Sequence, residues 1–200
     1  MKKVLIIGIP ITIIYSIGLI YSEINFSTAH IRPYVTDIIG EVFFHGINTT
    51  LCTFLLWATS LLFALIIALE PESILGSNNN RFCFSQFLIF FYLGFDERFR
   101  FHEYIGDVLN INDAFVLLVI GIVELFLILT WKELKNLKYP IKIFPFIAGF
   151  FFGIMLIIDY FVPAIPCRLS LEDLTKLWGS IAMFIFAWKL IVFRIGSSFS

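Results

Sequence analysis

The chain has 200 residues, of which 60% are hydrophobic and only 14% are charged, and its mean hydropathy is +0.94. Soluble domains average about 45–50% apolar and about 25% charged residues, so this composition excludes an ordinary soluble domain and indicates a membrane protein. The net charge of −1 comes with no basic run interleaved with aromatic residues. Nucleic acid is therefore not an expected partner.

The N-terminus begins Met1-Lys2-Lys3 and continues as an apolar run over residues 4–21. Signal peptides have an apolar core of about 7–15 residues, which is shorter than this run. The nearest small-x-small site, Ser27-Thr28-Ala29, lies well past the end of the run. The pattern favours an uncleaved first membrane span over a cleaved signal peptide.

Long apolar runs recur along the whole chain. A helix needs about 20 mainly apolar residues to cross about 30 Å of hydrocarbon. The runs are continuous, without the alternation of a β-barrel strand, and their connectors contain Pro, Gly and Asn. The sequence therefore predicts one all-α domain over residues 1–200, an integral membrane bundle of six transmembrane helices at about 4–21, 42–69, 82–101, 114–131, 143–162 and 177–193.

Charged residues predict the orientation of this bundle. Lys and Arg accumulate in cytoplasmic loops, and their distribution here places both termini in the cytoplasm. Most of the 15 acidic residues and all three histidines then fall at the opposite, extracytoplasmic end. The Met-Lys-Lys start and the short loops favour a bacterial inner membrane, with membrane lipid as the surrounding partner.

The third predicted span carries the most unusual pattern. Its apolar part, residues 82–95, covers only about 21 Å, so the helix has to continue through a charged segment at the membrane boundary. Charges in that position are functional candidates by default. In a continuous helix, Asp96, Arg100 and Glu103 share one stripe and form an ion-pair ladder. His102 lies on another face and reaches those acids only if the helix ends or unwinds nearby.

Glu41 and His45 begin the second predicted span at a spacing of i, i+4. A carboxylate and an imidazole at this spacing share a helix face and can bind one metal ion. The same spacing also suits a hydrogen-bonded pair in which Glu41 orients His45. Both readings stay open at this point.

The last span opens with Ser170, Glu172 and Asp173, which predict a helix N-cap followed by acids that complement the helix dipole. Lys176 lies one turn further and is expected to pair with Asp173 or with the acids of the third span.

Glu124 lies near the middle of the fourth span, where an ionised carboxylate is costly. We expect it either to be protonated or to pair with Thr59, Ser60 or Gln86 on a neighbouring span. A proton or ion relay is the functional alternative.

The stretch from Gly94 to Glu103 contains Asp-Glu followed, after four residues, by His-Glu, and it resembles a motif of uncharacterised bacterial multi-pass membrane proteins. The resemblance extends to Glu41 and to the segment from Glu172 to Gly179. It implies a shared site at one end of the bundle, without an assigned activity. A more distant similarity is to the alkaline ceramidase-like membrane hydrolases, which hold zinc near one membrane face. That family uses a late His-x-x-x-His pair, whereas this chain has no histidine after His102.

These features support three functions. The first is a non-enzymatic membrane protein, such as a sensor or partner subunit, in which ion pairs involving Arg100, Asp173 and Lys176 fix helix packing. The second is a metal-dependent hydrolase, with zinc as the candidate cofactor, acting on a lipid or lipid-linked substrate. The third is an ion-coupled transporter that uses Glu124. For the hydrolase, Glu97 or Glu172 is the candidate catalytic base, and the candidate metal ligands are Glu41, His45, Asp96, His102 and Glu103.

Overall fold

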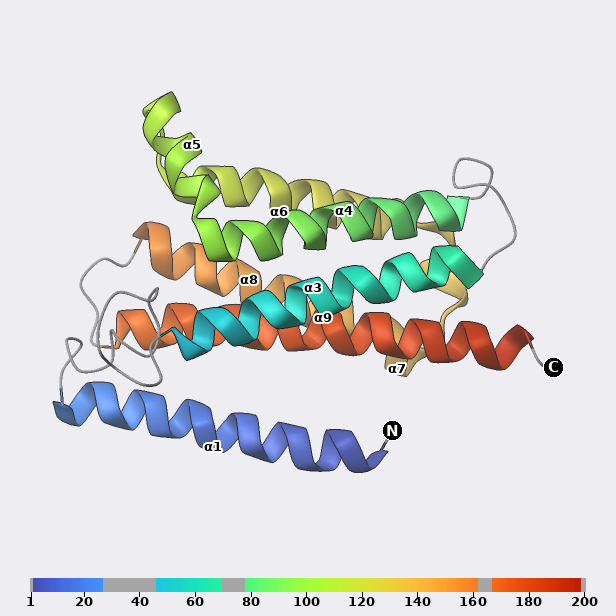
Figure 1. Cartoon of the computed structure of the whole chain (residues 1–200), viewed down its shortest axis with the longest axis horizontal. Helices are drawn as coiled ribbons and strands as arrows, with labels where there is room; N and C mark the ends of the chain where they lie inside the picture. The colour runs from blue at the N-terminus through green and yellow to red at the C-terminus, as the bar shows by residue number, and fades with distance from the viewer. Residues whose placement is uncertain (1, 27–45, 70–77, 162–166, 199–200) are drawn as a thin grey trace.

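The computed structural model describes residues 2–26, 46–69, 78–161 and 167–198, and every regular element within these ranges is a helix (Figure 1). The prediction of an all-α fold is therefore confirmed. The elements are α1 (Lys2–Phe26), α3 (Ile47–Leu69), α4 (Asn78–Phe99), α5 (Phe101–Leu109), α6 (Asp113–Thr130), the 3-10 turn η1 (Lys132–Asn136), α7 (Tyr139–Lys142), α8 (Phe144–Phe161) and α9 (Arg168–Ser198).

Helix α9 is the longest element, with 31 residues, and it lies between α3 and α8. Helix α4 packs along α3, and α6 contacts both α8 and α4 (Figure 1). Helix α1 lies beside α9 at one side of the bundle. The centre is aromatic, since the fully buried Phe63 of α3 lies 6.2 Å, between ring centroids, from Phe82, Phe90 and Phe186. These rings hold α3, α4 and α9 together.

Four helical segments of the described chain are long and apolar enough to cross a membrane, rather than the six predicted: Ile47–Leu69, Asp113–Thr130, Tyr139–Tyr160 and Arg168–Gly196. The difference has a simple cause. Helix α4 begins with three asparagines and Arg81 and ends with Asp96, Glu97 and Arg98, so its apolar part is short and its hydropathy is low. In the first helix, the described apolar stretch is the shorter Ile13–Phe26.

The third predicted span is not one continuous helix through residue 101. Helix α4 ends at Phe99, and Arg100 adopts a left-handed conformation with φ 56° and ψ 42°. Residues with a Cβ rarely adopt this conformation inside a helix, so the chain changes direction here. The short α5 then runs away from the axis of α4 (Figure 1).

The last helix begins earlier than predicted, at Arg168 rather than at residue 177. Its first turns are polar, so hydropathy alone did not extend the span to them. These turns are supported by the i, i+4 pair between Arg168 and Glu172, whose charged atoms lie 3.8 Å apart.

Helices α3 and α4 approach closely at Gly94. A Cβ added there would lie 2.3 Å from Cδ1 of Trp57, a rigid indole on α3. The Trp57 ring also packs against Phe95, with centroids 5.1 Å apart. Only a residue without a side chain fits between the two helices at this point.

We expect Gly94→Ala to destabilise the bundle by about 1–3 kcal/mol, because overpacking a close contact displaces the neighbouring ring. Thermal unfolding in detergent measures the effect. Gly121→Ala on α6 is the matched control, since a Cβ there meets nothing within 4 Å. That variant should be neutral or slightly stabilising, because alanine favours a helix over glycine. Equal unfolding midpoints for the two variants would contradict the close contact.

Candidate functional site

Charged and polar side chains from several helices gather at one end of the bundle, which we call the polar end. The C-terminal ends of α1 and α4, the N-terminal ends of α3 and α9, and helix α5 all lie at this end (Figure 1). The polar end of the described chain comprises Glu23, Asn48, Asp96, Glu97, His102, Glu103, Asp113, Asp159, Arg168, Glu172, Asp173 and Lys176.

Lys176 of α9 is the centre of a buried group that we call the lysine cluster, made of Glu97, Asp173 and Lys176. The Lys176 ammonium Nζ lies 3.3 Å from Glu97 Oε2 on α4 and 3.7 Å from Asp173 Oδ1 on its own helix. The three side chains are only 18%, 11% and 8% exposed for Lys176, Glu97 and Asp173. One ammonium therefore compensates two carboxylates. Lys176 pairs both with Asp173 and with an acid of the third predicted span, the two partners expected as alternatives from the sequence.

Helix α3 joins this cluster through a neutral side chain. The fully buried Asn48 donates from Nδ2 to the backbone carbonyl oxygen of Asp173 over 3.2 Å. A buried amide that bonds another helix fixes their relative rotation, since moving either helix leaves the amide unpaired. The lysine cluster thus connects α3, α4 and α9.

Asp96 and His102 form a second pair across the break in the chain. Oδ1 of Asp96 accepts a hydrogen bond of 2.7 Å from the backbone N–H of His102. Oδ2 of the same carboxylate lies 2.7 Å from the imidazole nitrogen Nδ1 of His102. Asp96 is 3% exposed, so this contact is well shielded from solvent. In a continuous helix these two side chains would point to different faces, so the pair requires the helix to end between them. The left-handed conformation of Arg100 ends α4 at this point.

Burial by itself lowers the pKa of His102, but the hydrogen bond and charge of Asp96 more than offset that effect. The pKa of His102 is consequently raised above its ordinary value of 6.5. The folded protein therefore favours protonation of His102 more than the unfolded chain does.

The predicted ion-pair ladder of Asp96, Arg100 and Glu103 is wrong, because it required a continuous helix and α4 ends at Phe99. Arg100 does pair with Glu103, with Nε donating to Oε1 over 2.6 Å. The Asp96 carboxylate instead binds His102. The interruption between Phe99 and Phe101 separates the two pairs.

The predicted N-cap at Ser170 is also wrong, because α9 has already begun at Arg168. The backbone N–H of Ser170 donates to Oε2 of Glu23 over 3.1 Å, and both residues are buried. A carboxylate from the end of α1 therefore satisfies the first turn of α9, where an anion is favourable. The sequence offered only a weak signal for this role of Glu23, an acid two residues after the end of an apolar run.

Arg168 connects α8 to the start of α9. Its guanidinium lies 2.9 Å from Asp159 Oδ1 and 3.8 Å from Glu172 Oε2. Glu172, a candidate base, is therefore held in an ion pair.

The remaining sequence candidates divide into two groups. Glu41 and His45 lie outside the described residues, so their pairing stays a prediction. Glu124 of α6 accepts a hydrogen bond of 2.8 Å from Nε2 of the fully buried Gln86 on α4, one of the three partners expected for it.

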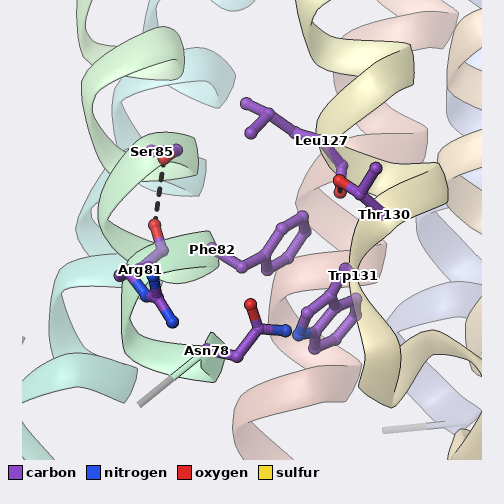
Figure 2. A pocket seen from close by; sticks show the side chains of 7 residues that line it. All are labelled: Asn78, Arg81, Phe82, Ser85, Leu127, Thr130 and Trp131. Carbon is purple, nitrogen blue, oxygen red and sulfur yellow. Dashed lines mark hydrogen bonds between the residues drawn. The ribbon is translucent and has the colours of Figure 1, made fainter. Parts of the chain in front are cut away.

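A hollow of about 200 Å³ lies at the opposite end of α4, near its first turn (Figure 2). The Phe82 and Trp131 rings stack there with centroids 4.1 Å apart, and Ser85 donates to the carbonyl oxygen of Arg81 over 2.9 Å. Arg81 is the one titratable residue among those lining it, which are Asn78, Arg81, Phe82, Ser85, Leu127, Thr130 and Trp131. The residues that line the hollow thus include no pair of titratable side chains that could act as general acid and general base.

Metal ligation among the described residues is possible at His102, Glu103 and Asp113, whose ligand atoms all lie within 4.8 Å of one another. Asp113 was not among the ligands predicted from sequence. Its only signal was its position after Asn112, at the start of an apolar helix.

The fold and the polar end define a class, a helical bundle with several helices apolar enough to cross a membrane, which is compatible with an integral membrane protein. The chain belongs to the family described as "Domain of unknown function (DUF8692)", whose model matches residues 4–190. This match carries no assigned activity and no link to ceramidase-like hydrolases. No curated protein and no solved structure matches the chain.

The raised pKa of His102 predicts a pH-dependent contribution to stability. This contribution is complete below the ordinary pKa of 6.5 and is lost as the pH rises through the raised folded value. Unfolding midpoints of the wild type and His102→Gln, measured across pH with a chelator present, should therefore differ most at low pH. The variant keeps the backbone N–H, so the comparison isolates the ring. A difference that is constant with pH would contradict the assignment.

Proposed function

We propose that this protein is an integral protein of a bacterial inner membrane, with six membrane-crossing helices and both termini in the cytoplasm. We further propose that it is non-enzymatic, a sensor or partner subunit whose charged end fixes the packing of its helices. The observation that carries this proposal is the lysine cluster, in which one buried ammonium on α9 compensates two carboxylates. Membrane lipid is the proposed surrounding partner.

The lengths of α1 and α4 support two crossings beyond the four apolar segments. Helix α4 has 22 residues and α1 has 25, which correspond to about 33 Å and about 37 Å. Helix α4 runs antiparallel to α3 over this length, as the Ser60–Phe87 hydrogen bond and the Trp57–Phe95 contact show. Charges at the end of such a helix are tolerated where they pair inside a bundle, as Glu97 does.

Helix α1 runs antiparallel to α9. Ser16 accepts a hydrogen bond of 3.2 Å from Trp178 Nε1, and Glu23 bonds the earlier residue Ser170. The start of α1 and the end of α9 accordingly lie toward the same end of the bundle (Figure 1). Termini at the same end fit an even number of crossings, and the Lys and Arg distribution supports the cytoplasm for that end.

The two candidate catalytic bases support a structural role rather than proton abstraction. Glu97 lies against Lys176, and Glu172 pairs with Arg168. Each carboxylate therefore already has a cation partner inside the bundle, and a packing role accounts for both without a substrate. A zinc-dependent hydrolase acting on a lipid is the second candidate, favoured by the imidazole–carboxylate pair of His102 and Asp96.

A transporter that uses Glu124 has less support. The Glu124 carboxylate accepts a hydrogen bond from Gln86 on a neighbouring helix. A polar residue in this position is accounted for by such a contact between helices.

The topology predicts that two positions of the chain lie on opposite sides of the membrane, which two side-specific reporters can test. A green fluorescent protein fused after Ser200 should fluoresce, because it folds in the cytoplasm. Alkaline phosphatase inserted at residue 111, between α5 and α6, should be active, because it requires the oxidising extracytoplasmic side. An inactive phosphatase at residue 111 together with a fluorescent C-terminal fusion would contradict the orientation.

Removing one member of the lysine cluster should be far more damaging than removing its charges together. Lys176→Met leaves two carboxylates without their cation and should destabilise the protein by about 3–5 kcal/mol, as for other buried ion pairs. The triple variant Lys176→Met/Glu97→Gln/Asp173→Asn removes all three charges and should recover most of that loss. Lys189→Met on the same helix is the control and should cost about 1 kcal/mol or less, since Lys189 makes an exposed hydrogen bond.

Denaturation in detergent measures these differences, and complementation of a deletion strain separates structure from chemistry. A triple variant as unstable as Lys176→Met would contradict the compensation argument. A triple variant that is stable but fails to complement would overturn the non-enzymatic role, because the charges would then be needed for something other than packing.

A further inference from the structure

Three potential metal ligands from two helices converge at the corner between α5 and α6. His102 and Glu103 lie in the first turn of α5, and Asp113 is the first residue of α6. Their ligand atoms all lie within 4.8 Å of one another, and each side chain is partly shielded from solvent. The group thus combines one imidazole with two carboxylates. Asp113 lies on a different helix from the other two ligands, so the tertiary fold is needed to bring it to them.

The backbone around α5 brings these ligands together. Both ends of α5 carry a left-handed residue, Arg100 with φ 56° and Asn110 with φ 52°, so the chain reverses within a few residues. At Gly106 the start of α6 lies close to α5, since a Cβ there would be 3.1 Å from Cα of Asp113. Side chains from both helices therefore reach the same point.

The two ring nitrogens of His102 have different environments. Nδ1 lies 2.7 Å from Asp96 Oδ2, on a carboxylate that is itself 3% exposed. This leaves Nε2 as the nitrogen that can bind a ligand. Histidines that bind metals usually donate their other N–H to a carboxylate in this way, which fixes the ring orientation and raises its basicity.

The donor set selects among metals. Zinc and related transition ions bind imidazole together with carboxylate, whereas Mg²⁺ and Ca²⁺ prefer sites made only of oxygen. Ligands about 2.1 Å from a tetrahedral zinc lie about 3.4 Å apart. The ligand atoms here lie within 4.8 Å of one another, so they must approach by up to about 1.4 Å. Arg100 now pairs with Glu103, but its side chain is 60% exposed and can move into solvent.

We propose that His102, Glu103 and Asp113 bind one divalent transition-metal ion of the zinc class, with Asp96 as the residue that positions the imidazole. Three protein ligands leave a fourth position for water or an outside ligand. The site links α5 to α6 and, through Asp96, to α4. The proposal goes beyond the packing role of the lysine cluster and does not depend on which side of the membrane the polar end faces.

Calorimetric titration of Zn²⁺ into the tag-free, chelator-stripped chain in detergent tests the site. The wild type should bind one equivalent, and an excess of Mg²⁺ should not displace it. His102→Ala and Asp113→Asn should each weaken binding at least about tenfold, and Asp96→Asn should weaken it about 10- to 100-fold. Asp107→Asn, an exposed acid on the same short helix, is the control and should bind as the wild type does.

Asp113→Asn also separates lost ligation from lost folding. The Asp113 side chain accepts a hydrogen bond from the Ala114 N–H over 2.9 Å through Oδ1, and asparagine keeps that oxygen. Its unfolding midpoint without metal should therefore match the wild type, whereas the increase that zinc produces in the wild type should be lost. Absence of one-equivalent binding in the wild type, or unchanged binding in both His102→Ala and Asp113→Asn, would overturn the site.

Discussion

The ammonium of Lys176, placed between Glu97 and Asp173, is the interaction on which the arrangement of the polar end depends. Buried carboxylates are costly without a compensating cation, and a lysine that serves two of them cannot move away from either. The contact fixes the end of α4 against the start of α9. Neighbouring residues on a helix point about 100° apart, so with Glu97 directed toward α9, Asp96 is left to face the segment that follows α4.

That orientation explains why α4 ends where it does. The Asp96 carboxylate receives both the backbone N–H and the ring nitrogen of His102, and this requires the chain to turn at Arg100. The favourable contacts of a buried carboxylate offset the cost of a left-handed arginine. The reversal creates α5, brings Asp113 beside His102, and so produces the only described group with the donors of a transition-metal site.

The other helix contacts follow from a limitation of apolar helices, whose side chains do not by themselves select a neighbour. If lipid surrounds the bundle, hydrophobic burial gives helices little reason to choose one neighbour over another, because lipid is as apolar as leucine. Close approach and polar contacts must then decide the neighbours. Gly94 against Trp57 and Gly179 against Phe152 provide the close approach. The Gln86–Glu124 and Arg194–Asn79 hydrogen bonds provide polar contacts at other levels of the bundle.

The sequence by itself determined the helical class, most of the apolar segments and the gathering of titratable residues at one end, because apolar run length and charge position are local properties. It also restricted Glu124 to a few partners, since polar groups in an apolar helix have few alternatives. Only the tertiary structure decided that Lys176 serves both carboxylates, that Glu23 of α1 satisfies the first turn of α9, and that Asp113 joins His102. These contacts join distant residues. The approach of Asp113 to His102 also depends on a backbone reversal at Arg100, which helical periodicity cannot predict because it assumes a continuous helix.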